Sequence, residues 1–278
     1  MEHPTEDRVP VIDAVTVLLL RDAPDGSDPA TGPEVLLLER HTDSPFAPGA
    51  LVFPGGKIDD VDRGLDPGRR RCADPAAWAE RLGVADEDAA IAMLVAAVRE
   101  TFEEAGVLLA GRRDGTPLTD APLPARELAT TRKAMAARDV DLDWRPWLEE
   151  HDLVLDLDAL SMWSWWVTPE GRPRRFDTRF LVAALPAGQI ASPDEVEITA
   201  MRWLSPIDAL ASQQRGEATI IFPTRCTLEQ LAAHPDRRSA LAAARRGDVD
   251  LRRIQPTSMI IDGVRMILHP DADAPVPA

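Results

Sequence analysis

Between Asp86 and Gly106 the apolar positions follow the period of an α-helix. Apolar residues recur there at helical spacing, namely Ile91, Leu94, Val95, Val98 and Phe102. A stripe of this kind covers one helix face and predicts that this face packs against a core. Gly106 follows the last apolar residue and is a natural stop for a helix. We therefore predict a long helix over 86–106, around which the rest of the chain is organised.

Three glutamates lie on the opposite face of this predicted helix. Glu100, Glu103 and Glu104 are spaced i, i+3 and i+4, so their carboxylates are neighbours. Three like charges that close repel one another unless a cation lies among them, and oxygen ligands favour Mg²⁺ or Mn²⁺. Arg99 adds one positive charge beside the three carboxylates. The same pattern also fits a solvated acidic helix end that needs no metal ion.

Strand and helix patterns alternate along the rest of the chain. In one predicted strand the even-numbered positions from Phe176 to Val182 alternate with Asp177 and Arg179, which lie on its other face. Further strands are predicted at 11–20, 34–40, 50–53, 107–110, 162–167, 198–204, 252–255, 259–261 and 264–268. Further helices are predicted at 74–82, 122–138, 144–150, 205–212, 225–234 and 236–246. Such a mixture favours the α/β class, with an α/β/α sandwich around a mixed sheet.

The length of the chain limits its domain organisation. A chain of 278 residues can bury a full core. We predict one domain over 1–278, with helical additions at 111–160 and 205–250.

Charge and cysteine content narrow the class of protein. Lys+Arg 31 against Asp+Glu 47 gives a net charge of −16, which argues against a general nucleic-acid binder. A polyphosphate substrate would have to be met by local cations and a metal ion. Cys72 and Cys226 lack zinc-like spacing, and no disulfide is expected between them. The most extended apolar stretch, Val15 to Leu20, is too short to span a bilayer, and no signal peptide is evident. We expect a cytoplasmic protein with no membrane partner.

A glycine-rich stretch, Phe53-Pro54-Gly55-Gly56, precedes the acidic helix, and the two segments together resemble the Nudix box of the Nudix hydrolases. The matching positions are Gly56, Arg99, Glu100, Glu103, Glu104, Gly106 and Val107. The sequence departs from the box at Asp62, which stands in place of the first glutamate, and at Thr101, which fills a usually apolar position.

Spacing is the third departure from the box. Arg99 follows Gly56 by 43 positions where the family pattern has 14, so the box holds a 29-residue insert within 57–98. One branch of the family, which includes coenzyme A diphosphatases of peroxisomes and their bacterial relatives, resembles this chain with a comparable insert.

The resemblance implies an activity and a cofactor. Nudix hydrolases cleave a nucleoside diphosphate linked to another group, with Mg²⁺ or Mn²⁺ as cofactor. By position, Glu100, Glu103 and Glu104 would hold the metal ion, and Arg99 would hold the glutamates in place through ion pairs. Asp62 is the least supported position, because the insert separates it from the helix.

The same resemblance implies roles for a loop and for the glycines. The general base would be Glu100 or an acid of the loop before strand 198–204, either Glu195 or Glu197. Gly55 and Gly56 would let the backbone approach the metal-bound diphosphate closely.

Two further segments are similar to the branch that acts on coenzyme A. The first matches its signature at Leu36, Leu37, Arg40, Gly49 and Phe53 to Gly56, and departs from it at Leu38, His41 and Pro45. This match makes Arg40 a candidate for substrate binding, although the residues also fit a simple strand, loop and glycine turn.

The second segment contains Trp-Val-Thr-Pro-Glu-Gly at 166–171 and Arg-Arg-Phe-Asp-Thr-Arg-Phe at 174–180. Arg175 and Arg179 are candidates for binding substrate phosphate in a forked geometry. They could instead neutralise nearby carboxylates, for example Asp177 beside Arg179. The tryptophans of this segment are expected to be core residues.

Coenzyme A or an acyl-coenzyme A is therefore the first choice of substrate. ADP-ribose, NADH or another dinucleotide is the alternative within the enzyme class. Two alternatives are not enzymes. One is a Nudix-fold regulator that binds a nucleotide without cleaving it, and the other is an interaction scaffold. The resemblance also suggests a homodimer.

Overall fold

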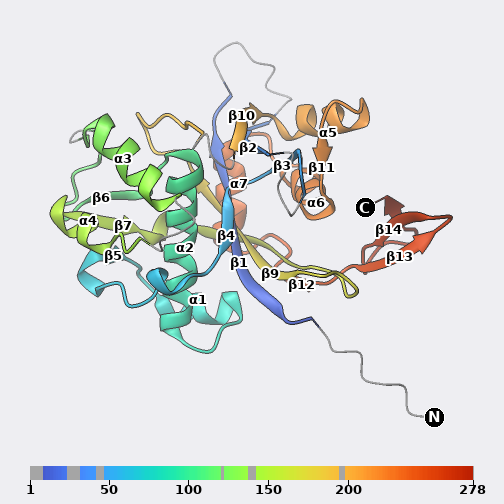
Figure 1. The fold of residues 1–278 in the computed structure, drawn as a ribbon, viewed down its shortest axis with the longest axis horizontal. Coiled ribbons are helices and arrows are strands. Elements are labelled where there is room, and N and C mark those ends of the chain that lie inside the picture. The colour runs from blue at the N-terminus through green and yellow to red at the C-terminus, as the bar shows by residue number, and fades with distance from the viewer. Residues whose placement is uncertain are drawn as a thin grey trace.

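The computed structural model describes residues 9–23, 32–41, 47–119, 122–136, 142–193 and 198–277. Within these ranges a nine-stranded mixed β-sheet runs through the molecule (Figure 1). Its strands are β1 (Val11–Arg21), β2 (Glu34–Arg40), β3 (Ala50–Val52), β4 (Gly55–Lys57), β8 (Ser161–Val167), β9 (Arg175–Ala184), β10 (Ile198–Leu204), β11 (Thr219–Ile220) and β12 (Arg253–Ile254). The order is β11-β3-β2-β1-β9-β8-β12, while β10 pairs with β2 and β4 pairs with β1.

Strand β1 changes partner halfway along its length. On one side it pairs in parallel with β9 from Val11 to Leu20. On the other side its residues 14–16 pair with β4, whereas Leu20 and Arg21 pair with β2. The glycine-rich stretch at 55–57 is therefore held against the first half of β1. It forms a short strand, because its backbone joins the sheet.

Helices cover both faces of the sheet, which confirms the α/β/α sandwich (Figure 1). On one face lie α1 (Pro75–Leu82), α2 (Glu87–Ala105), α3 (Ala125–Met135) and α4 (Arg145–Glu150), and on the other lie α5 (Pro206–Gln214), α6 (Phe222–Leu231) and α7 (Arg237–Arg246). Successive side chains of β1 point to opposite faces of the sheet, so β1 contributes apolar residues to the cores on both sides. Val15, Val17 and Leu19 join the cluster around α2, and Leu18 and Leu20 join the cluster with α6 and α7.

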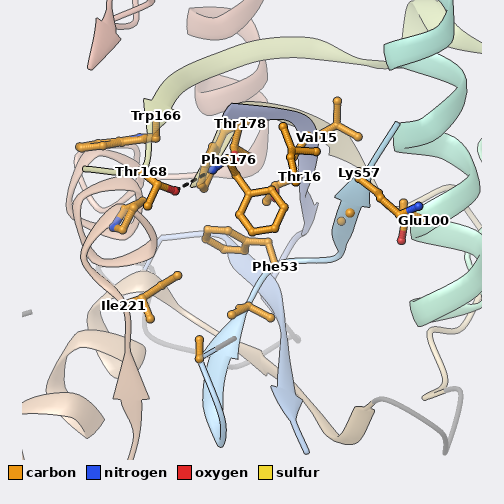
Figure 2. A pocket seen from close by; sticks show the side chains of 18 of the residues that line it. Val15, Thr16, Phe53, Lys57, Glu100, Trp166, Thr168, Phe176, Thr178 and Ile221 are labelled. Carbon is orange, nitrogen blue, oxygen red and sulfur yellow. Dashed lines mark hydrogen bonds between the residues drawn. The ribbon is translucent and has the colours of Figure 1, made fainter. Parts of the chain in front are cut away.

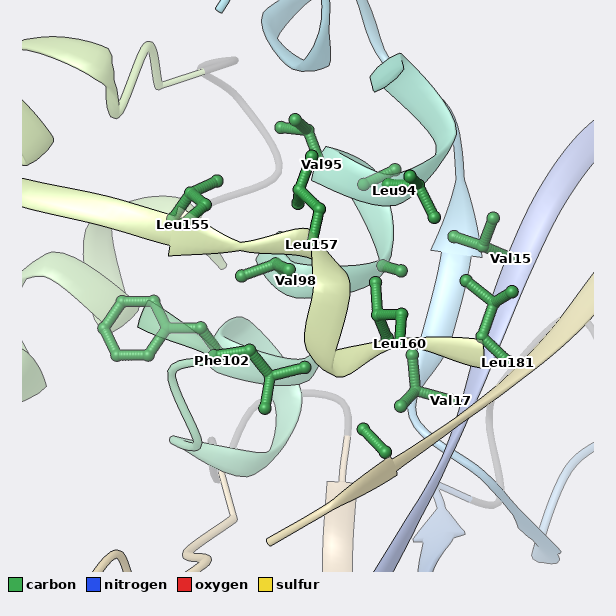
Figure 3. Packing of buried hydrophobic residues seen from close by; sticks show 14 of the residues in the cluster. Val15, Val17, Leu94, Val95, Val98, Phe102, Leu155, Leu157, Leu160 and Leu181 are labelled. Carbon is green, nitrogen blue, oxygen red and sulfur yellow. The ribbon is translucent and has the colours of Figure 1, made fainter. Parts of the chain in front are cut away.

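Helix α2 is the predicted 86–106 helix. The Asp86 side chain accepts a hydrogen bond from the Ala89 N–H at 2.8 Å, and Gly106 ends the helix with φ +69°. The apolar stripe packs on β1 and on the segment around Leu157, with Leu94 on the side of Val15 and Val98 beside Leu157 (Figure 3). However, the helix is buried on nearly every side, including its acidic end. The reading of this end as a simple solvated helix end is therefore wrong.

The insert and the segment after α2 together build a second sheet that the sequence did not predict. Its strands are β5 (Arg70–Arg71), β6 (Ala110–Arg112) and β7 (Leu153–Asp156), in the order β5-β7-β6. The predicted strand at 107–110 is thus wrong in its bounds. The 111–160 region contains α3 and α4 but also part of this sheet, so it is not purely helical.

The C-terminal part forms a third sheet of β13 (Thr257–Ile261), β14 (Val264–Leu268) and β15 (Val276–Pro277). A turn at Asp262–Gly263 joins its first two strands, and both residues have positive φ. Cys72 and Cys226 are both free thiols. Across the described ranges, no helix combines the length and the apolar character that crossing a bilayer requires.

Candidate active site at the acidic end of helix α2

Arg99 is the centre of a buried ion-pair network. The residue is 6% exposed, and its guanidinium donates to Asp62 through Nε and Nη2 at 2.7 and 2.9 Å. Its Nη1 donates to Glu100 at 2.9 Å and to Glu103 at 3.3 Å. Nη2 also donates to the Lys57 carbonyl at 3.2 Å. Burial opposes the charge, but the carboxylates of Glu100, Asp62 and Glu103 raise the pKa of Arg99 above its usual value. Arg99 therefore fixes the carboxylates in place as a permanent cation.

Asp62 belongs to this network although 37 positions separate it from Arg99. A 3₁₀ turn, η2 (Asp60–Asp62), brings it to the end of α2, and its Oδ2 also accepts the Asp59 N–H at 2.8 Å. The side chain is fully buried. Sequence reasoning gave Asp62 the least support, because spacing alone could not reveal that the insert folds back on the helix.

Replacing Asp62 with asparagine is expected to destabilise the protein by about 3 kcal/mol, because a buried cation then loses a bidentate counter-charge. Asp60→Asn is the matched control, since the Asp60 side chain is fully exposed in the same turn. Urea unfolding of the two variants measures the difference. Equal stabilities would show that the Arg99–Asp62 pair does not hold this end of the helix.

The glycines of β4 lie directly against the glutamates. The Gly55 N–H donates to Glu104 Oε2 at 2.9 Å. A Cβ on Gly56 would lie 2.4 Å from Glu100 Oε1, so there is no room for a side chain between β4 and this carboxylate. Burial raises the pKa of Glu100 above its usual value, and Asp62 and Asp59 act in the same direction, while Arg99 opposes them. Close packing of β4 on α2 therefore fixes the position of Glu100.

A cavity of about 940 Å³ opens beside this cluster. One end is lined by the polar side chains of Lys57, Asp59, Arg99, Glu100, Glu103 and Glu104. Away from this end the walls are largely apolar and aromatic, and Phe53 and Phe176 lie between Glu100 on one side and Trp166 and Ile221 on the other (Figure 2). A cavity of this size suits a ligand as large as a nucleotide cofactor.

Strand alternation decides which side chains of β8 and β9 reach the cavity. Phe176, Thr178 and Phe180 line it, and Trp166 stands opposite Thr178 on the same face. Trp165 stands opposite Arg179 on the other face. The predicted alternation of this strand is confirmed, and its even-numbered face is the cavity wall.

Arg175 and Arg179, predicted to bind substrate, lie on the face that points away from the cavity. Arg179 is 3% exposed and donates to Asp13 at 2.5 Å and to the Leu82 carbonyl at 3.0 Å. It also lies 3.4 Å from Asp177, the ion pair foreseen as its alternative role. Arg175 donates to the Thr168 carbonyl at 3.1 Å and to Gln255 at 3.1 Å. The structure therefore supports the alternative role for Arg179, which pairs with carboxylates. Arg175 instead joins neighbouring segments through neutral acceptors.

The other predicted substrate-binding residues do reach the cavity. Arg40, Gly55 and Gly56 all line it. Glu195 and Glu197, the predicted loop acids, and Pro45 lie outside the described residues.

The carboxylates suit a hard divalent cation by their chemistry. Glu100, Glu103 and Glu104 supply carboxylate oxygens at one end of the cavity, and a carboxylate offers several lone pairs. Among the described residues, however, no group of three His, Cys, Asp or Glu side chains is already gathered around a common point. The donor set fits a metal ion, and binding would draw the side chains together.

Sequence reasoning missed the contribution of α6 to the cavity. Its first residues, Phe222, Pro223 and Thr224, line the wall next to Ile221. The predicted helix began at Arg225, three residues too late. Pro223 was the available signal, because proline is favoured in the first turn of a helix. Trp166, expected in the core, is buried and also lines the cavity.

Comparison with known proteins adds an independent observation. The family model described as the NUDT19 Nudix domain matches residues 70–231. The human protein named acyl-coenzyme A diphosphatase NUDT19 is 36% identical over 239 residues, which cover 75% of this chain and 63% of that protein. The chicken protein of the same name is 34% identical over 248 residues, which cover 76% of this chain and 65% of that protein. The chain thus spans less than two thirds of the length of these curated relatives. A crystal structure of a Nudix hydrolase from Alicyclobacillus acidocaldarius is 28% identical with a TM-score of 0.62, covering 84% of this chain and 96% of that one.

Proposed function

Because the chain belongs to the Nudix hydrolase family, we propose that it hydrolyses the diphosphate bond of a nucleoside diphosphate linked to a second group, with coenzyme A or an acyl-coenzyme A as substrate. The observation that carries the proposal is a group of three glutamates at one end of a nucleotide-sized cavity, with Glu100 and Glu103 held by Arg99 and Glu104 held by the Gly55 N–H. The names of the human and chicken relatives favour the coenzyme A class.

Nudix hydrolases generally use a divalent metal ion, and we propose Mg²⁺ or Mn²⁺ held by Glu100, Glu103 and Glu104. Such an ion would offset the charge of the diphosphate and lower the pKa of a bound water. Arg99 is a positioning residue, because its hydrogen bonds orient the carboxylates without reaching the substrate bond. Gly55 and Gly56 leave the first two positions of β4 without side chains, so that the backbone there can approach the diphosphate.

The general base is proposed to be Glu100 or an acid of the 194–197 loop, Glu195 or Glu197. Among the described residues Glu100 is the candidate, because burial raises its pKa and it lines the cavity. For substrate phosphate we retain Arg40 and add Arg172 and Arg174, which line the cavity where Arg175 and Arg179 do not.

A substrate panel tests the proposal. Purified protein with Mg²⁺ is incubated separately with coenzyme A, an acyl-coenzyme A, ADP-ribose, NADH and a diadenosine polyphosphate, and the products are separated by chromatography. We expect the highest kcat/KM for coenzyme A or its thioester. A preference for ADP-ribose or NADH would keep the hydrolase and reject the coenzyme A class. Thermal stabilisation by these compounds without any cleavage would favour the non-catalytic nucleotide-binding regulator.

A cytoplasmic location and a homodimer stay predictions from the sequence. Gel filtration with light scattering would test the homodimer directly.

A further inference from the structure

The far end of the cavity is formed by the beginning of helix α6. Ile221 precedes the helix and makes no capping hydrogen bond with its side chain. The first helical hydrogen bond runs from the Arg225 N–H to the Ile221 carbonyl at 2.9 Å. The N–H groups of Phe222 and Thr224 come before it, so no helical carbonyl accepts from them, and Pro223 has no N–H to offer. The cavity wall therefore carries free backbone donors at the positive end of a helix dipole.

Thr224 supplies a second and independent donor at this place. It is 2% exposed and lines the cavity, and its hydroxyl makes no hydrogen bond with the rest of the described chain. Because Thr224 lines the cavity and its hydroxyl has no partner in the described chain, this hydroxyl is available to an acceptor in the cavity. An acceptor from a ligand in the cavity would satisfy it.

The charges along the cavity wall favour an anion at this end. Its described acidic side chains are Asp59, Glu100, Glu103 and Glu104, all beside the end of α2. Beyond that cluster the charged side chains of the described wall are Arg40, Arg172 and Arg174, which are all positive. In a protein of net charge −16, long-range attraction cannot bring an anion to the cavity, so local donors must bind it.

Packing separates this end from the glutamates. Phe222 meets Trp166 with ring centroids 5.9 Å apart, so the first turn of α6 lies against the end of β8. Ile221, Trp166 and Thr168 lie on one side of the pocket and Glu100 on the other, with Phe53 and Phe176 between them (Figure 2). An anion at α6 would thus be a second one, distinct from a diphosphate beside α2.

We propose that the start of α6 is a second anion subsite, in which the N–H groups of Phe222 and Thr224 and the Thr224 hydroxyl donate to a phosphomonoester of the substrate. Arg172 and Arg174 add positive charge to the same cavity. The inference rests on the proposed function and narrows it to nucleotides that carry a phosphate on the ribose in addition to the diphosphate. Thr224 then determines specificity and takes no part in bond cleavage.

Binding of two product-like nucleotides to the full chain without metal tests the subsite independently of activity. Calorimetry compares adenosine 3′,5′-bisphosphate with AMP, which differ by one phosphomonoester. The wild type is expected to prefer the bisphosphate, and Thr224→Val is expected to weaken bisphosphate binding about tenfold, the loss of one hydrogen bond to a charged group. AMP binding should not change.

Thr227→Val is the matched control. Thr227 is fully buried in the same helix, its hydroxyl also has no partner among the described residues, and it does not line the cavity. The control variant should bind both nucleotides as the wild type does. Equal wild-type affinity for the two nucleotides, or an unchanged preference in Thr224→Val, would overturn the subsite. If the wild type prefers the bisphosphate over AMP but cleaves no dinucleotide, the result would support the subsite and contradict the proposed hydrolase activity.

Discussion

Glu103→Gln and Glu104→Gln are each expected to lower kcat for a coenzyme A substrate by roughly 100- to 10,000-fold, because each removes a charged ligand from a metal ion whose stabilisation of the reaction is worth several kcal/mol. Glutamine has nearly the same shape as glutamate. Its amide oxygen can still accept the Gly55 N–H that now binds Glu104. Both variants should therefore stay folded, as circular dichroism and thermal unfolding would show.

Glu87→Gln is the control for this pair of variants. It makes the same chemical change in the first turn of α2, where the side chain is exposed, and it should leave kcat unchanged. Near-full activity in both Glu103→Gln and Glu104→Gln would show that these carboxylates do not hold the catalytic metal ion.

The second large effect is expected on replacing the two glycines of β4 with alanine. One substitution should lower activity and the other should lower stability. At Gly56 a Cβ would lie 2.4 Å from Glu100 Oε1 and 2.6 Å from its Cδ, and these atoms end a flexible side chain. Gly56→Ala should therefore keep its stability but displace Glu100 from Arg99, with a loss of activity of about 100-fold or more.

Gly55→Ala should instead unfold more easily. Its Cβ would lie 2.2 Å from the Val15 carbonyl oxygen, and Gly55 has φ +155°, which L-residues rarely adopt. Backbone cannot move aside as a side chain can, so we expect a destabilisation of roughly 2–4 kcal/mol. Thermal unfolding and steady-state kinetics of both alanine variants measure the contrast. Equal stability of the two variants would contradict the close packing of β4 on β1.

Periodic features were predictable because they depend on neighbours in the sequence. The apolar spacing and Gly106 located α2, and alternation along 176–182 identified both faces of β9. What alternation could not tell is which face borders the cavity, since this depends on the elements packed on each side. Arg179 was therefore predicted to bind phosphate, although it stacks on Trp165 with its guanidinium carbon 4.4 Å from the ring centre.

The contacts that the insert makes with α2 and with β7 could not be predicted from the sequence for a related reason. The Arg99–Asp62 pair depends on how the intervening chain folds back on the helix, and the periodicity of its separate elements does not determine that path. The same holds for the sheet that Arg70–Arg71 forms with β7. A basic run of this kind usually indicates a solvated loop, yet Arg71 donates to the Arg112 carbonyl at 2.9 Å and so helps to hold the small sheet together.

The most direct test of the proposed hydrolase is product analysis by mass spectrometry after incubation with coenzyme A and Mg²⁺ in ¹⁸O-labelled water, with a parallel reaction in EDTA. We expect adenosine 3′,5′-bisphosphate and phosphopantetheine, with one labelled oxygen in one of the two products, and no turnover in EDTA. Absence of cleavage of coenzyme A and of the other dinucleotides, with either Mg²⁺ or Mn²⁺, would contradict hydrolysis at the acidic end of α2 and leave nucleotide binding as the function of the cavity.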